Sequence, residues 1–189
     1  MRIVLASGSP RRRDLLESIG LGFEVRPPDI QEIRHPDESP SDFVERMARE
    51  KAESVDAPGS LVIAADTVVV FRGRILGKPG HPSEARAMLE SLSGESHTVL
   101  TGVAVRTGDE CRVHVESSSV RFSELTSDEI ARYVDTGEPM DKAGAYALQG
   151  VGALFVESVS GSPSNVIGLP LAPLAQLLRS VGVELIPGP

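Results

Sequence analysis

The chain has 189 residues, of which 40% are hydrophobic and none is Trp, a length that suits one well-packed domain spanning residues 1–189. Its formal net charge of −8 argues against a surface that coats nucleic acid, so any local basic cluster is expected to bind a small anion instead. One cysteine excludes an internal disulfide framework, and no apolar run approaches the ~18 residues of a membrane span. We therefore expect a cytoplasmic protein without a membrane or nucleic-acid partner.

Residues 1–20 predict a strand, a tight loop and a helix. Residues 3–6 are apolar and β-prone, as in a buried strand. Ser9 suits the N-cap and Pro10 the first helical position, while Gly20 suits a left-handed C-cap.

Three arginines, Arg11, Arg12 and Arg13, follow in the first helical turn, where free N–H groups and the helix dipole already make a positive end. Two interpretations are open. The arginines bind an anion, since a Ser-Gly-Ser loop before a helix is a ready phosphate site. Alternatively they form a solvated basic turn that Asp14 and Glu17 partly compensate.

A polar loop at 27–40 carries Glu32, and carboxylates in such loops are usually solvated. The next helix is signalled by Ser39 as its cap and Pro40 as its first residue. Lys51 lies within the apolar stripe of that helix. Either its stem extends to water or its ammonium enters a site between the helix and the sheet.

The most hydrophobic stretch, residues 61–71, has the β-branched content of a central strand, but Asp66 and Thr67 interrupt it. A buried, unpaired carboxylate is costly, so Asp66 must meet cations, a metal or dedicated hydrogen-bond donors. A structural ion pair is one explanation. We favour a functional one, because perturbed acidic groups gather at active sites.

A turn and a short return strand at 74–76 lead to Gly77-Lys78-Pro79. This segment is not a P-loop, because it is too short and has Pro where Ser or Thr is required. Lys78 is either an exposed loop lysine or a fixed cation near Asp66.

The other predicted elements are a strand at 23–26, a helix at 83–92, an antiparallel hairpin of 97–106 with 111–122, a helix after a capping box at 126–129, a glycine-rich functional loop at 137–150, a strand at 153–159, a loop at 161–170 and a helix through 174–181.

Several chemistries lack support. The four histidines show no His-Glu-x-x-His spacing, and a single cysteine cannot form a zinc cluster. No Gly-x-Ser-x-Gly or Gly-x-Gly-x-x-Gly motif occurs. A basic loop, separated lysines and a few acidic residues remain, which are the parts of metal-assisted phosphoryl chemistry with Mg²⁺ or Mn²⁺ as the divalent cation.

Five ordered blocks are more specific. They are Leu-Ala-Ser-Gly-Ser-Pro-Arg-Arg at 5–12, Ala-Asp-Thr-Val-Val at 65–69, Gly-Lys-Pro at 77–79, Asp-Lys-Ala-Gly-Ala-Tyr-Ala-Leu-Gln-Gly at 141–150 and Gly-Leu-Pro-Leu at 168–171. With these blocks the chain resembles the Maf family of nucleoside triphosphate pyrophosphatases from its first strand to its last helix.

The resemblance implies an ITPase-like α/β fold, in which a mixed twisted sheet flanked by helices forms two lobes around a nucleotide cleft. It also implies hydrolysis between the α- and β-phosphates, which gives a nucleoside monophosphate and pyrophosphate with a divalent cation. Asp66 is then the proton acceptor. The branch that prefers dTTP and UTP is associated with Arg11, Thr67 and Gln149, and all three residue types are present.

Both arguments together give a mechanistic hypothesis. Ser7, Arg11, Arg12 and the helix N-terminus hold the phosphate chain, while Lys51 and Lys78 neutralise charge on the leaving pyrophosphate.

In the same hypothesis Glu32 and Asp66 hold the metal, and Asp66 also orients or deprotonates the attacking water. Gln149 carries an amide donor and acceptor suited to a pyrimidine edge, and Arg13 receives no role.

Two other functions are compatible with the same loop. One is a non-catalytic nucleotide-binding regulator of division or stress responses. The other is a house-cleaning enzyme with mainly modified nucleotides as substrates. For the dTTP/UTP pyrophosphatase itself, we expect a role in preventing the incorporation of modified nucleotides and an influence on cell division. A homodimer is compatible with the sequence, since small α/β enzymes often pair symmetrically.

Overall fold

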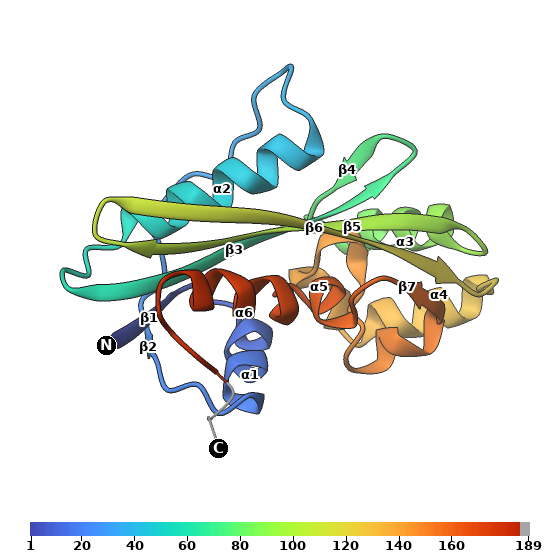
Figure 1. The fold of residues 1–189 in the computed structure, drawn as a ribbon. Helices are drawn as coiled ribbons and strands as arrows, with labels where there is room; N and C mark the ends of the chain where they lie inside the picture. Colours follow the sequence, from blue (N-terminus) through green and yellow to red (C-terminus); the bar gives the residue numbers. More distant parts are fainter. Residues whose placement is uncertain (186–189) are drawn as a thin grey trace. The chain divides into compact units, whose positions relative to one another are not determined.

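The structure is a computed structural model that describes residues 1–185 (Figure 1). Its elements are β1 (Arg2–Ala6), α1 (Pro10–Ser18), β2 (Glu24–Val25), α2 (Pro40–Ser54), β3 (Ser60–Phe71), β4 (Arg74–Leu76), α3 (Pro82–Leu92), β5 (Ser96–Thr107), β6 (Glu110–Phe122), α4 (Ser127–Asp135), the 3₁₀ helices η1 (Glu138–Asp141), η2 (Ala143–Ala145) and η3 (Val151–Phe155), β7 (Val156–Ser160), α5 (Pro163–Ile167) and α6 (Leu171–Ser180).

The strands form one seven-stranded sheet in the order β2-β1-β3-β5-β6-β7, with β4 paired to β3. β1 pairs in parallel with both β2 and β3, whereas β4 pairs antiparallel with β3 and β7 antiparallel with β6. The sheet is therefore mixed, and the predicted α/β class is confirmed. No helix within residues 1–185 is long and apolar enough to cross a membrane.

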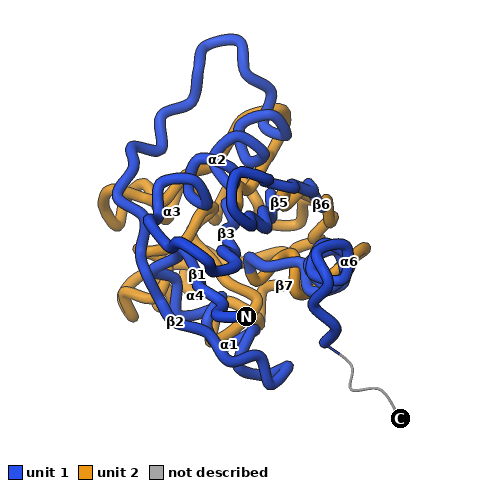
Figure 2. The backbone as a smooth tube through the Cα atoms, turned by 60° about the vertical axis from the view of Figure 1, so that its left-hand side comes forward, with its two compact units in different colours: residues 1–66, 101–116, 168–189 blue, residues 67–100, 117–167 orange. Residues whose placement is uncertain are grey.

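The chain divides into two compact units, which Figure 2 colours separately. The first unit contains residues 1–66, 101–116 and 168–189, and the second contains residues 67–100 and 117–167. A single domain spanning 1–189 and a nucleotide cleft between two lobes both stay predictions.

In the first unit, alternate side chains of β1 and β3 face opposite sides of the sheet, as the period of a strand requires. Figure 1 shows α1 and α6 on one side of these strands and α2 on the other. One cluster therefore joins the strands to α1 and α6, and a second joins them to α2. The first includes Ile3, Leu5, Leu16, Leu61, Ile63, Leu174 and Leu178, and the second includes Val4, Ala6, Ala48, Ala52, Val62 and Ala64.

The backbone of α2 also lies directly on β5. A Cβ atom on Gly102 would stand 2.2 Å from the Val44 carbonyl oxygen and 2.6 Å from its carbonyl carbon. Only a residue without a side chain allows this approach. Gly102 therefore fixes how closely α2 packs against the sheet.

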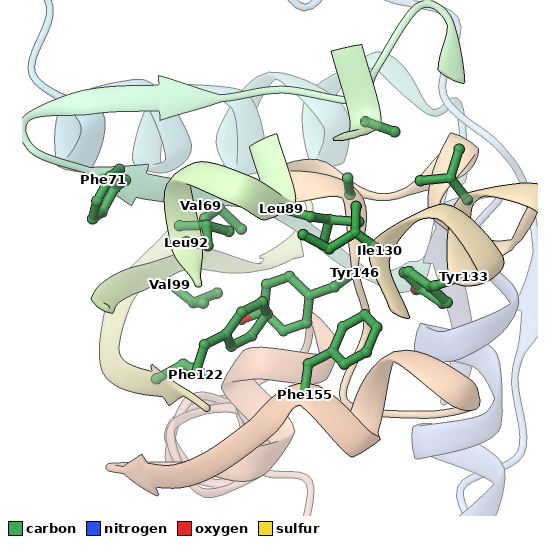
Figure 3. Packing of buried hydrophobic residues seen from close by; sticks show 14 residues of the cluster. Val69, Phe71, Leu89, Leu92, Val99, Phe122, Ile130, Tyr133, Tyr146 and Phe155 are labelled. Carbon is green, nitrogen blue, oxygen red and sulfur yellow. The ribbon is translucent and has the colours of Figure 1, made fainter. Parts of the chain in front are cut away.

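The second unit has an aromatic core, shown in Figure 3. Phe122 and Tyr146 meet edge to face with ring centroids 4.7 Å apart, and Tyr133 and Phe155 meet in the same way at 5.0 Å. Such edge contacts are favourable beyond the area they bury. The glycine-rich segment is thus tied to this core through Tyr146.

Two boundaries differ from the prediction. Residues 151–155 form the 3₁₀ helix η3 and the strand starts only at Val156. The N–H groups of Val151 and Gly152 donate to the Glu138 carboxylate, and the Val156 N–H donates to the Ala153 carbonyl and closes the helical turn. The predicted loop at 161–170 contains α5, whose start carries the pair Ser162-Pro163. The same Ser-Pro signal starts α1 and α2, so the sequence held the information.

Candidate active site

The loop between β1 and α1 is fixed by side-chain hydrogen bonds. The Ser7 hydroxyl oxygen accepts from the backbone N–H of Ser9 and from Arg12 Nη1, each over 3.2 Å. Arg12 Nε donates to the Gly168 carbonyl at 2.8 Å. Ser9 is the N-cap as predicted, although its side chain makes no capping hydrogen bond. Three predicted features therefore hold one another: the serine loop, the second arginine and the Gly-Leu-Pro-Leu block.

Arg12 lies in a field set by two carboxylates. Burial lowers the pKa of its guanidinium, and the charges of Asp66 and Glu32 raise that pKa, while Arg11 lowers it. An arginine keeps its proton at any physiological pH, so Arg12 is a fixed cation beside these acids. Arg11 is half-buried in the same helical turn.

Lys51 provides the second cation of the cluster. Its Nζ lies 2.6 Å from Glu32 Oε1 and 2.6 Å from Asp66 Oδ1, and the Lys51 side chain is only 6% exposed. The suggestion that its stem extends to water is therefore wrong. Asp66 lies on the same strand face as Val62 and Ala64, which pack against α2, and this places its carboxylate beside Lys51.

Glu32 reaches this cluster from an irregular loop that Arg46 of α2 clamps. Arg46 contacts both oxygens of Glu38, Nε to Oε1 at 2.6 Å and Nη2 to Oε2 at 2.7 Å, and Nη2 also donates to the Ile33 carbonyl at 2.9 Å. The hydrogen bonds from Arg46 lower the pKa of Glu38 to about 2 despite its burial. Such bidentate pairs are geometrically specific. α2 thus holds Lys51 and, through Ile33, the backbone next to Glu32.

The donor set suits a hard divalent cation. Asp66 and Glu32 each place one carboxylate oxygen 2.6 Å from Lys51 Nζ, so the two carboxylates meet at this ammonium. No group of three or more His, Cys, Asp or Glu side chains suited to a metal occurs within residues 1–185. Mg²⁺ is usually held by one or two carboxylates together with waters and substrate phosphates. The two carboxylates fit that pattern.

The remaining predicted site residues belong to the second unit. Thr67 is half-buried in β3, Lys78 is exposed after β4, and Gln149 is exposed between η2 and η3. The Gly77 carbonyl accepts from the Gly144 N–H at 3.1 Å, which joins the Gly-Lys-Pro segment to the glycine-rich segment. Any contact of these three residues with the cluster around Asp66 stays a prediction.

The structure therefore brings together five of the predicted site residues in the first unit: Ser7, Arg12, Glu32, Lys51 and Asp66. Arg13 instead forms exposed ion pairs, 3.6 Å from Asp14 and 3.8 Å from Glu17. Sequence analysis missed Arg46 and Glu38. Nothing in the local pattern distinguishes them from other charged residues, because their importance arises from a contact between a helix and a loop.

Comparison with known proteins agrees with this arrangement of motifs. The family described as "Maf-like protein" matches residues 2–181. The chain belongs to the Maf-like family. A dTTP/UTP pyrophosphatase of Anaeromyxobacter sp. (strain Fw109-5) is 55% identical over 186 residues, which are 96% of this chain and 90% of that Maf-like relative.

Other Maf-like relatives are similar over nearly their full length. The dTTP/UTP pyrophosphatases of Hahella chejuensis (strain KCTC 2396) and Symbiobacterium thermophilum are each 48% identical, over 97% and 99% of this chain and 94% and 97% of their own lengths. The solved structure of the Staphylococcus aureus Ham1 protein covers 65% of this chain and 72% of its own, with 18% identity and a TM-score of 0.44.

Proposed function

We propose that this Maf-like protein is a nucleoside triphosphate pyrophosphatase. It hydrolyses the α-β phosphoanhydride of dTTP and UTP and releases the nucleoside monophosphate and pyrophosphate. Relatives at 48% to 55% identity carry the name dTTP/UTP pyrophosphatase, which supports this substrate choice. The observation that carries the proposal is the buried Asp66 carboxylate, held 2.6 Å from Lys51 beside Glu32 and Arg12.

Phosphate binding is assigned to the start of α1. Arg11, Arg12, the Ser7 hydroxyl and the free N–H groups of the first turn surround the phosphate chain. Lys51 and Lys78 balance the charge that develops on the departing pyrophosphate. This explains why α1 begins with cations although its dipole disfavours them.

Asp66 is assigned the role of proton acceptor. Its carboxylate orients the attacking water and accepts the proton as the water attacks the α-phosphorus. Glu32 and Asp66 would also hold a divalent cation, Mg²⁺ or Mn²⁺, which would neutralise charge on the phosphates. Lys51 holds both carboxylates in place, since its Nζ lies 2.6 Å from one oxygen of each.

Base selection is assigned to Arg11, Thr67 and Gln149. The amide of Gln149 offers both a donor and an acceptor to a pyrimidine edge.

A homodimer is also part of the proposal, and sedimentation velocity of the purified protein tests it.

The substitution Asp66→Asn tests the catalytic assignment. It keeps the shape and leaves Lys51 paired with Glu32, so the fold should persist, whereas pyrophosphate release from dTTP should fall by about 100-fold or more. Asp109→Asn, in the exposed turn between β5 and β6, is the matched control and should match the wild-type rate. Near-normal turnover in the Asp66 variant would sink the assignment, and tight dTTP binding without turnover by the wild-type protein would favour a regulator instead.

A further inference from the structure

The segment that carries Gln149 is held on both sides. Gln149 itself is exposed, and it lies between Tyr146, which is buried, and Val151-Gly152, whose backbone meets a carboxylate. Two residues separate Gln149 from Tyr146 and one separates it from Val151, so the backbone of this segment has little freedom of its own. The two attachments differ in chemistry.

The first attachment is aromatic. The Tyr146 hydroxyl lies 2.7 Å from His97 Nε2, and the Tyr146 ring meets His97 and Phe122 edge to face at 5.2 and 4.7 Å (Figure 3 shows Tyr146 against Phe122). Burial raises the pKa of Tyr146 and lowers that of His97 to about 4. Both groups are therefore neutral at physiological pH, and their hydrogen bond lies in an apolar core.

The second attachment is the carboxylate of Glu138. Oε1 accepts from the Gly152 N–H at 3.0 Å and from the Tyr133 hydroxyl at 3.1 Å, and Oε2 accepts from the Val151 N–H at 3.0 Å. Burial raises the pKa of Glu138, but the hydrogen bonds from Gly152, Val151 and Tyr133 outweigh it and leave the pKa lowered. Glu138 is thus an ionised acceptor that holds the backbone of Val151 and Gly152 and the Tyr133 hydroxyl together.

The backbone at Gly150 shows how closely the segment fits this carboxylate. A Cβ atom at Gly150 would stand 2.9 Å from both Glu138 oxygens, and its φ of +79° is strained for any other residue. The segment therefore lies against the carboxylate itself, directly after Gln149.

We propose that Glu138 is a positioning residue for pyrimidine selection, a role that rests on the proposed function. Its carboxylate fixes the backbone after Gln149, as Tyr146 and His97 fix the backbone before it. The backbone from which the Gln149 side chain extends is thereby ordered before substrate arrives, so less ordering entropy is lost when the amide binds the base. A base that cannot reach the amide from this backbone position binds less well.

The substitution Glu138→Gln tests the role. Whichever way its amide turns, the NH₂ group faces an N–H or O–H donor, so at least one hydrogen bond to the segment is lost. We expect the ratio of kcat/KM for dTTP over dCTP to fall by about fivefold or more, and the amides of Val151 and Gly152 to exchange hydrogen about tenfold faster. Tyr133→Phe, which removes one donor only, should shift both quantities less and in the same direction.

Gln149→Ala and the double variant with Glu138→Gln separate positioning from general weakening. If Glu138 acts through Gln149, the double variant has the selectivity of Gln149→Ala alone, because coupled residues are not additive. Glu157→Gln is the matched control. This exposed glutamate of β7 pairs with Arg121 at 3.5 Å in the same unit, and its substitution should leave both selectivity and exchange unchanged.

The outcomes distinguish this inference from the function on which it rests. A wild-type protein that releases no pyrophosphate from dTTP would overturn the proposed function and the selectivity role together. Unchanged exchange of Val151 and Gly152 in Glu138→Gln, measured without substrate, would overturn the positioning role alone. So would an unchanged dTTP to dCTP ratio, or a double variant whose loss of selectivity equals the product of the single losses.

Discussion

A lysine shared by two carboxylates is the central feature at the scale of single residues. The Lys51 side chain is 6% exposed and that of Asp66 7%, whereas Glu32 is 54% exposed. Two buried charges are tolerated only as a pair, because each alone bears a large desolvation penalty. Lys51 and Asp66 therefore depend on each other for stability.

Lys51→Met keeps the length and apolar stem of the side chain but leaves Asp66 buried without its ammonium. We expect unfolding in urea to show a loss of about 3 kcal/mol, because breaking a buried pair strands one charge. Pyrophosphate release should be lost as well. Adding Asp66→Asn should recover part of the stability and none of the activity, and a double variant as unstable as Lys51→Met would contradict the pairing.

At the scale of elements, α2 decides the geometry of the site. It carries Lys51, its Arg46 clamps the loop with Glu32, and its backbone lies on β5 at Gly102. A helix this close to a strand cannot shift toward it, and it moves away only if the apolar contacts of its buried face are lost. The distance between helix and sheet is consequently set by one glycine.

Gly102→Ala should therefore displace α2. Its Cβ would lie 2.2 Å from the Val44 carbonyl oxygen, so we expect a loss of about 3 kcal/mol in the free energy of unfolding, typical of severe overpacking. Gly22→Ala is the control, since nothing lies within 4 Å of a Cβ there. Equal melting temperatures for the two variants would show that α2 does not rest on Gly102.

Local signals predicted these elements well where local chemistry decides them. Ser39 caps α2 and Thr126 forms the capping box of α4, as their spacing indicated. Gly20 ends α1 with a φ of +73°. Asp66 also stood out, because an acid inside an apolar strand needs partners wherever the strand lies.

Long-range partners explain what sequence analysis missed. η3 replaces the start of a predicted strand, and Glu138, far back in the chain, accepts its first N–H groups. Lys51 was ambiguous since its neighbours along the helix do not reveal which acids face it. The Arg46 and Glu38 pair had no sequence signal for the same reason.

At the scale of the whole molecule, His97 and Glu38 are two of the groups that lower stability in acid, and both have large pKa shifts. His97 is buried and its pKa is lowered from 6.5 to about 4, so the folded state resists a proton that the unfolded chain accepts. Arg46 lowers the pKa of Glu38 from 4.5 to about 2, so the folded state binds this proton only at a lower pH than the unfolded chain does. Both effects remove stability as the pH falls.

Urea unfolding across the acid range should show two successive losses. The first is absent above pH 6.5, grows as the pH falls and is complete near pH 4, in the range where His97 titrates. It should amount to about 3 kcal/mol, from the linkage between a shifted pKa and stability. The second sets in below pH 4.5 and continues toward pH 2. His97→Asn should flatten the first and Glu38→Gln the second; an unaltered pH profile in either variant would contradict its assignment.

The first unit is assembled from three separate parts of the chain, and this sets an order for biosynthesis. A ribosome releases α1 and β1 long before α6, and the entire second unit is synthesised between them. Until α6 emerges, Leu5 and Leu16 lack the cover of Leu174 and Leu178. Arg12 likewise waits for the Gly168 carbonyl that orients it. The nascent chain therefore exposes these apolar side chains until translation is nearly complete, and Arg12, which we propose binds phosphate, is oriented only at that stage.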